Sequence, residues 1–222
     1  MNAWKIFETD LITQMPLILA GLVNTLKLAG LISVTGLLLG IVVFYLSISK
    51  NFFIRTATNS YISFFIGMPL IVLLFLMYYG LPQWGLRMDP FEVAAIGFTL
   101  NVAAYNAAYM KTAYNGLNFI QLDAAAAQGF NPFQIFRLIT LPQVLRLSVP
   151  ALTNQVIGNL KDSSVAFLIQ YTEFFARMQE LAASNFQFFK AYLLTAIVYL
   201  ALVSLIVLFA RAIERRVVFP TQ

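Results

Sequence analysis

The sequence of 222 residues contains no cysteine and no histidine, and only 10% of its residues are charged. Without cysteine the chain forms neither a disulfide framework nor a thiolate metal site, and without histidine it lacks the commonest metal ligand and general base. Soluble domains carry about 25% charged residues. The scarcity of charge, with 60% hydrophobic residues and a mean hydropathy of +0.80, indicates an integral membrane protein.

Two motifs are also missing. The G-x4-G at Gly80 and Gly85 is followed by Leu86 and Arg87, not by Lys and Ser or Thr, so it is not a phosphate-binding loop. We therefore expect that the chain does not hydrolyse ATP by itself. The N-terminus lacks the basic region, short apolar core and cleavage site of a signal peptide.

Long apolar stretches predict an all-α membrane protein with five transmembrane helices, because about 20 apolar residues cross a bilayer. We place the spans at residues 21–48, 58–81, 92–112, 147–171 and 190–211 of a single domain, 1–222. In the first span, Gly36 and Gly40 form a GxxxG motif, which favours close helix packing. In the second, Pro69 frees a backbone carbonyl, which is tolerated where neighbours or a cavity satisfy it.

The basic residues predict the orientation in the membrane. The positive-inside rule assigns one set of them to the cytoplasm. This set comprises Lys50, Arg55, Lys111, Arg137, Arg146, Arg211, Arg215 and Arg216. With five spans, the N-terminus lies outside and the C-terminus lies in the cytoplasm.

The fourth span contains two charges, Lys161 and Asp162. The uncharged part before them, residues 147–160, is about 21 Å of helix, too short to cross alone, so we expect both charges within the membrane. Neighbours on a helix point about 100° apart, so one should face a pathway and the other a packed or interfacial surface. The alternative is that the two charges neutralise each other or hold a dimer interface.

Between the third and fourth spans, residues 121–142 predict a helix hairpin. Asp123 is the expected N-cap of a first, alanine-rich helix, and Gly129 is expected to end it in a left-handed turn. Asn131 and Pro132 suit the N-cap and first position of a second helix. Pro142 is expected to end or kink that helix.

This spacing resembles the EAA loop of ABC importer permeases, EAA-x3-G-x9-I-x-LP, with Asp123 in place of the usual Glu. In that family the loop is the cytoplasmic coupling helix that docks on the ATPase. Other segments resemble the polar amino acid uptake branch, of the histidine, glutamine and arginine type. They are residues 21–28 (GLxxTLKL), 61–80 (the RGTPLLVQLFxxYYG segment), 161–166 (LKDTSLA) and 214–216 (ERR).

The resemblance implies an ABC type I importer permease-like fold. It also implies a permease subunit that forms the translocation pathway for a polar amino acid, and a cationic amino acid is the more specific form of this expectation. The chain is then not an enzyme and holds no cofactor, while ATP and Mg belong to the partner ATPase. The implied partners are an ATP-binding-cassette ATPase dimer, a second permease (the same chain or a paralogue), an extracytoplasmic substrate-binding protein and the lipid bilayer, without nucleic acid. The implied location is the bacterial cytoplasmic (inner) membrane.

The resemblance also implies two groups of site residues. The group expected to contact the ATPase comprises Asp123, Ala124, Ala125, Gly129, Phe130, Pro132, Leu141 and Pro142. The group expected to line the substrate pathway comprises Asn101, Tyr105, Lys161, Asp162, Ser163 and Ser164. Of the two charges, the resemblance favours Asp162 for the pathway, because its family counterpart lies there.

The sequence departs from the family pattern in places that leave the substrate open. Residues 66–68 replace Arg-Gly-Thr, residues 105–108 lack the family's acid, and residues 118–121 replace Pro-Lys-Gly-Gln. A secondary transporter or channel subunit not driven by ATP is the alternative, and it would show an ion-coupling carboxylate and an internal repeat. A non-transporting scaffold would lack a charged pair like Lys161 and Asp162. We find no repeat, so a symmetric pathway would need a second permease.

Overall fold

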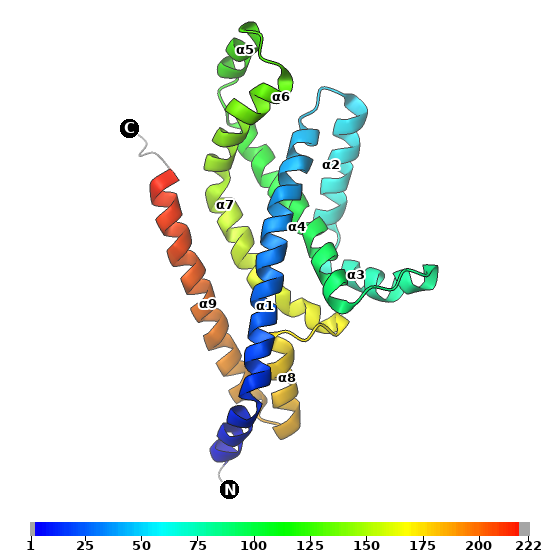
Figure 1. Cartoon of the computed structure of the whole chain (residues 1–222), viewed down its shortest axis with the longest axis vertical. Coiled ribbons are helices and arrows are strands. Elements are labelled where there is room, and N and C mark those ends of the chain that lie inside the picture. The colour runs from blue at the N-terminus through cyan, green and yellow to red at the C-terminus, as the bar shows by residue number, and fades with distance from the viewer. Residues whose placement is uncertain (1–2, 218–222) are drawn as a thin grey trace.

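The computed structural model describes residues 3–217, apart from the side chains of Ala3, Ile6 and residues 213–217, so the Glu214–Arg216 motif lies outside the described side chains. Within the described part every regular element is helical, which confirms the all-α prediction (Figure 1). The α-helices are α1 (Ala3–Ser47), α2 (Phe52–Gly67), α3 (Leu70–Phe75), α4 (Pro90–Asn115), α5 (Ile120–Ala127), α6 (Pro132–Ile135), α7 (Leu141–Asp162), α8 (Phe174–Asn185) and α9 (Phe188–Val217). Short π and 3-10 segments adjoin them: η1 (Leu76–Gly80), η2 (Leu81–Trp84), η3 (Phe136–Thr140) and η4 (Ser163–Ile169).

The long helix α1 runs beside the central helix α4, and two glycines allow the close approach. A Cβ on Gly36 would lie 2.5 Å from Val102 Cγ1, and one on Gly40 would lie 2.8 Å from Asn106 Cβ. Neither distance is possible for a real side chain without movement of α4. The GxxxG motif therefore packs as predicted.

The predicted second span, 58–81, is not one straight helix. It breaks at Met68 and Pro69, where α2 and the helical segment Leu70–Trp84 meet at an angle of 100°. Met68 is extended, with φ −90° and ψ 127°, because the ring of a following proline disfavours helical backbone. The segment is a broken span or a re-entrant loop.

In the described residues, the helices long and apolar enough to cross a membrane are Phe7–Ser47, Pro132–Ile169 and Phe188–Ala212, with the bent α2–α3 pair as a fourth. The polar-faced helix α4 does not meet that criterion, although it is 26 residues long. The count of five crossings therefore stays a prediction.

The two ends of the helix bundle differ. The α5–α6 hairpin and the last turns of α9 lie toward one end, whereas α8 and the start of α1 lie at the other (Figure 1). The predicted cytoplasmic segments thus share one end of the molecule.

We predict that a reporter that is active only outside the cytoplasm stays silent when it is fused after Gln222, because the basic residues near that end retain it in the cytoplasm. The same reporter fused before Met1 should be active. Reporter activity in intact cells measures both fusions. Activity after Gln222 would contradict the orientation.

Candidate functional site

The turn of the α5–α6 hairpin has the geometry that its glycine predicts. Gly129 has φ +87°, in the left-handed region. Around it, Phe130 N donates to Ala125 O at 3.2 Å and Gly129 N donates to Ala126 O at 3.0 Å. These two bonds form a Schellman motif, which satisfies the free carbonyls at the end of α5. The predicted left-handed turn is confirmed.

The start of α6 also follows the prediction, but the start of α5 does not. Asn131 Oδ1 accepts from Gln134 N at 2.9 Å, and Gln134 Oε1 accepts from Asn131 N at 2.8 Å, which completes a capping box. At α5 the predicted N-cap, Asp123, is wrong. Instead, Asn118 Oδ1 accepts from Ile120 N at 3.0 Å. Asp123 lies exposed within the first turn, where its negative charge interacts favourably with the helix dipole.

Pro142 does not end the second helix of the hairpin, so that part of the expectation is wrong, whereas a kink at Pro142 stays a prediction. The helical segment is continuous from Pro132 to Ile169. A π-helical turn, η3, directly precedes α7, and Pro142 lies in the first turn of α7. We infer that the wider turn accommodates the proline, which has no N–H to donate and crowds the preceding turn.

The hairpin is anchored at its base and exposed at its tip. Phe136 is buried, and its ring lies 4.5 Å from that of Tyr45 and 5.8 Å from that of Phe44, both on α1. Of the predicted ATPase-coupling residues, Ala125 is buried and Leu141 is partly buried. The others are exposed: Asp123, Ala124, Gly129, Phe130, Pro132 and Pro142. Exposed apolar side chains also lie along the hairpin, namely Phe119, Ile120, Phe133 and Leu138. Such a patch marks a contact surface.

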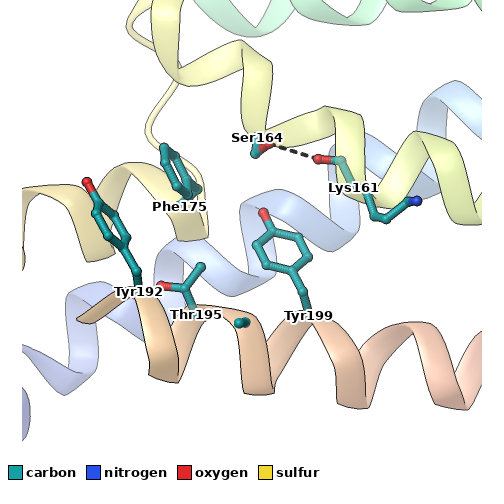
Figure 2. Close-up of a pocket in the computed structure, with 7 residues that line it drawn as sticks. Lys161, Ser164, Phe175, Tyr192, Thr195 and Tyr199 are labelled. Atoms are coloured by element: carbon teal, nitrogen blue, oxygen red, sulfur yellow. Dashed lines mark hydrogen bonds between the residues drawn. The ribbon is translucent and has the colours of Figure 1, made fainter. Parts of the chain in front are cut away.

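A hollow of about 420 Å³ lies between the end of α7, α8 and α9 (Figure 2). Two predicted pathway residues, Lys161 and Ser164, line it together with Phe175, Tyr192, Thr195, Ala196 and Tyr199. Figure 2 shows the Tyr199 ring rising from α9 toward Ser164 and the Lys161 ammonium turned away from Phe175. The hollow therefore has aromatic walls and hydroxyl groups, with a cation at one edge.

The other predicted pathway residues are not gathered at this hollow. Asn101 is buried on α4, and its Nδ2 donates to Phe65 O at 2.8 Å. In a regular helix Phe65 O would accept from residue 69, which is the proline that cannot donate. Asn101 thus satisfies the carbonyl that Pro69 frees, which is a structural task.

Three further predicted residues differ in exposure. Ser163 is fully buried, and its Oγ donates to Leu160 O at 2.7 Å. Tyr105 is partly buried beside Tyr109. Asp162 is exposed at the end of α7. The helical segment that contains it starts at Pro132, has 38 residues and is apolar enough to cross a membrane, and the depth of Asp162 within the membrane stays a prediction.

Sequence reasoning missed a buried carboxylate beside the hollow. Glu173 has 0% exposure at the start of α8. Its Oε2 accepts from Phe175 N at 2.9 Å, from Thr25 Oγ1 at 3.1 Å and from Tyr199 Oη at 3.3 Å, and its Oε1 accepts from Ala176 N at 2.7 Å. One side chain therefore joins α1, α8 and α9.

Two features support this junction. A Cβ on Gly21 of α1 would lie 2.9 Å from Glu173 O, so the glycine lets α8 approach. Burial raises the pKa of Glu173, and the four hydrogen bonds oppose that rise because they favour the charged form. An acidic residue directly before a helix was the available signal, but glutamate is not a preferred N-cap.

The comparisons with known proteins agree with one another. The family model described as "Binding-protein-dependent transport system inner membrane component" matches residues 32–219. The chain is 37% identical over 188 residues to a probable amino-acid ABC transporter permease protein, PatM, of Vibrio harveyi, covering 83% of this chain and 84% of that protein. It is 31% identical to the arginine transport system permease protein ArtQ of Bacillus subtilis (strain 168), covering 92% and 94%.

A solved structure is also similar. The crystal structure of an amino acid ABC transporter with histidines matches with a TM-score of 0.84 and 27% identity, covering 94% of this chain and 97% of that one. The similarity extends over nearly the whole of both chains.

We predict that the Glu173 carboxyl makes thermal stability depend on pH. Its folded pKa is raised, so its stabilising contribution is complete below the ordinary value of 4.5 and is lost as the pH rises through the folded pKa. The glutamine in Glu173→Gln does not titrate, so the fall in unfolding temperature that the Glu173 carboxyl causes with rising pH should be absent from this variant. The unfolding temperature, measured across pH, tests this. The control Glu180→Gln removes an exposed carboxylate of the same helix, which is paired with Arg177 at 2.7 Å. This variant should keep the pH dependence that comes from Glu173. Equal pH profiles for wild type and Glu173→Gln would contradict the prediction.

Proposed function

The chain belongs to the family of binding-protein-dependent transport system inner membrane components and is the permease subunit of an ATP-binding-cassette importer, and we propose that its cargo is a polar amino acid. The relatives support this cargo, since one is named as an arginine transport permease and another as a probable amino-acid permease. The chain makes and breaks no bonds, so it is not an enzyme. No observation favours an ion-coupled transporter or a channel.

The proposal extends to the partners. An ATPase dimer, carrying ATP and Mg, would bind the hairpin, and a substrate-binding protein would deliver cargo at the α8 end. A second permease, identical or paralogous, would complete the pathway, since five spans and no repeat leave one chain without internal symmetry. The hairpin end is then cytoplasmic and the α8 end faces outward.

One observation carries the coupling role: the exposed hairpin is joined without interruption to the hollow. The helical segment Pro132–Ile169 begins in the hairpin and contains Lys161 and Ser164. A displacement of the hairpin tip would therefore move the wall of the hollow. ATP-driven closure of the partner subunits would supply that displacement.

In the hollow we propose that Lys161 and Ser164 act on the passing cargo. Lys161 suits a carboxylate, and the hydroxyl of Ser164 is a neutral hydrogen-bonding group. Asp162 is the next residue and points to a different side of the helix, where we still propose that it meets the amine or guanidinium of the cargo. Asn101 is better explained by its bond to Phe65 O.

We predict that Gly129→Val abolishes substrate-stimulated ATP hydrolysis and uptake in the reconstituted transporter, because a β-branched residue is strained at φ +87° and would reshape the hairpin tip. Gly85→Val is the matched control. Gly85 has φ +84° and, like Gly129, no atoms within 4 Å of the position that a Cβ would occupy, but it lies far along the chain from the hairpin. Gly85→Val should cost similar backbone strain and keep coupling. Normal stimulation in Gly129→Val would remove the coupling role.

We predict that Asp162→Asn lowers uptake of a cationic amino acid far more than that of a neutral one, because it removes charge and keeps shape. Lys161→Gln should weaken both substrates alike, since every amino acid carries a carboxylate. Competition uptake assays in vesicles, normalised to the amount of protein, measure both variants. Equal losses for both substrates in Asp162→Asn would show that Asp162 is structural.

A further inference from the structure

A small, partly open cavity lies where α1, α4 and α7 meet, away from the hollow and the hairpin. It has a volume of about 40 Å³. Its polar walls are Ser33 of α1, Asn106 of α4, and Gln155 and Asn159 of α7, and its apolar walls are Leu37, Leu152 and Val156. Nothing in the coupling or transport roles uses these residues.

Most polar groups around the cavity are paired. Gln155 Nε2 donates to Asn159 Oδ1 at 3.0 Å, Asn159 Nδ2 donates to Ser33 Oγ at 3.0 Å, and Ser33 Oγ donates to Ala29 O at 2.6 Å. This series of hydrogen bonds joins α7 to α1. It does not reach α4.

The exception is Asn106, which is 3% exposed and whose Oδ1 is fully enclosed without a hydrogen-bond partner in the described residues. An enclosed amide oxygen without a donor is costly, and in a membrane protein the surrounding lipid offers no donor either. The side chain lines the cavity together with amide groups that have unused hydrogen-bonding capacity: Gln155 Oε1 and one N–H each on Gln155 and Asn159.

We propose that this cavity binds one water molecule, which donates to Asn106 Oδ1 and bridges it to the amide groups of α7. The cavity has room for a water, because a water site needs at least about 10–15 Å³ in the same measure, and a bound water needs two to four polar partners. The cavity is too small for an amino acid. A metal cation is disfavoured, because amide N–H groups share the walls and no carboxylate does. The water completes a junction of α1, α4 and α7.

The test uses the complete transporter in lipid nanodiscs. Asn106→Leu has a similar volume but no polar atom. If a water satisfies Asn106, the substitution breaks the bridge and lowers the unfolding temperature. If Asn106 Oδ1 is truly unpaired, the substitution removes a buried unsatisfied group and raises that temperature, which would overturn the proposal.

Ser148→Ala is the matched control. Ser148 is 2% exposed, its Oγ is likewise enclosed and unpaired among the described residues, and it lies on α7 outside this cavity. Its substitution should leave the unfolding temperature unchanged or higher. A fall equal to that of Asn106→Leu would show that the loss is not specific to the cavity and would count against the bridge.

Two further measurements do not depend on that single variant. Asn106→Leu and Gln155→Leu should be non-additive in the double variant although no direct hydrogen bond joins the two residues, because both act on one water. The wild-type transporter, imaged at a resolution that shows ordered water, should have density within hydrogen-bonding distance of Asn106 Oδ1. Additive effects, a direct Asn106–Gln155 bond or a well-defined cavity without density would each overturn the proposal.

Discussion

The close packing of α1 on its neighbours through glycine is the constraint on which the rest of this structure depends. In a membrane, burial of apolar surface does not favour one helix pair over lipid, so close contact and hydrogen bonds must hold helices together. Gly36 and Gly40 bring α1 against α4, and Gly21 brings it against α8. The other helices are joined to this frame by polar links. Asn101 holds the end of α2, Asn159 joins α7 to Ser33, and Glu173 joins α8 and α9 to Thr25.

What the sequence could predict was local. The hairpin turn depends on Gly129, Asn131 and Pro132, whose conformations are set by neighbours a few residues away. The apolar runs and the GxxxG spacing likewise need no knowledge of the partner helix. Even locally the prediction was incomplete: Asp123 was expected to cap α5, but the helix starts at Ile120, whose N–H is bonded by Asn118 Oδ1.

What could not be predicted depends on distant partners. Glu173 lies in a stretch that looks like a polar loop, and its role appears only when Thr25, 148 residues away, is placed beside it. Asn101 looked like a pathway residue, but its partner is the carbonyl of Phe65, left free by a proline on another helix. The continuity of the helical segment past Pro142, which joins Lys161 and Asp162 to the hairpin, was likewise not evident from the sequence, because a proline alone does not show whether a helix ends or continues.

That continuity has a mechanical consequence. The regular part of the segment, α7, is bounded by a π turn at Phe136–Thr140 and a 3-10 turn at Ser163–Ile169. Hydrogen-bond geometry is poorer in both types of turn, which makes them the easiest places for the segment to bend. The first lies at the base of the hairpin, and the second contains Ser164 at the wall of the hollow. Between them α7 is held to α1 by Asn159, so the two helices would carry a displacement from the hairpin to the hollow as one unit, and the turns at the ends of α7 would adjust its direction there.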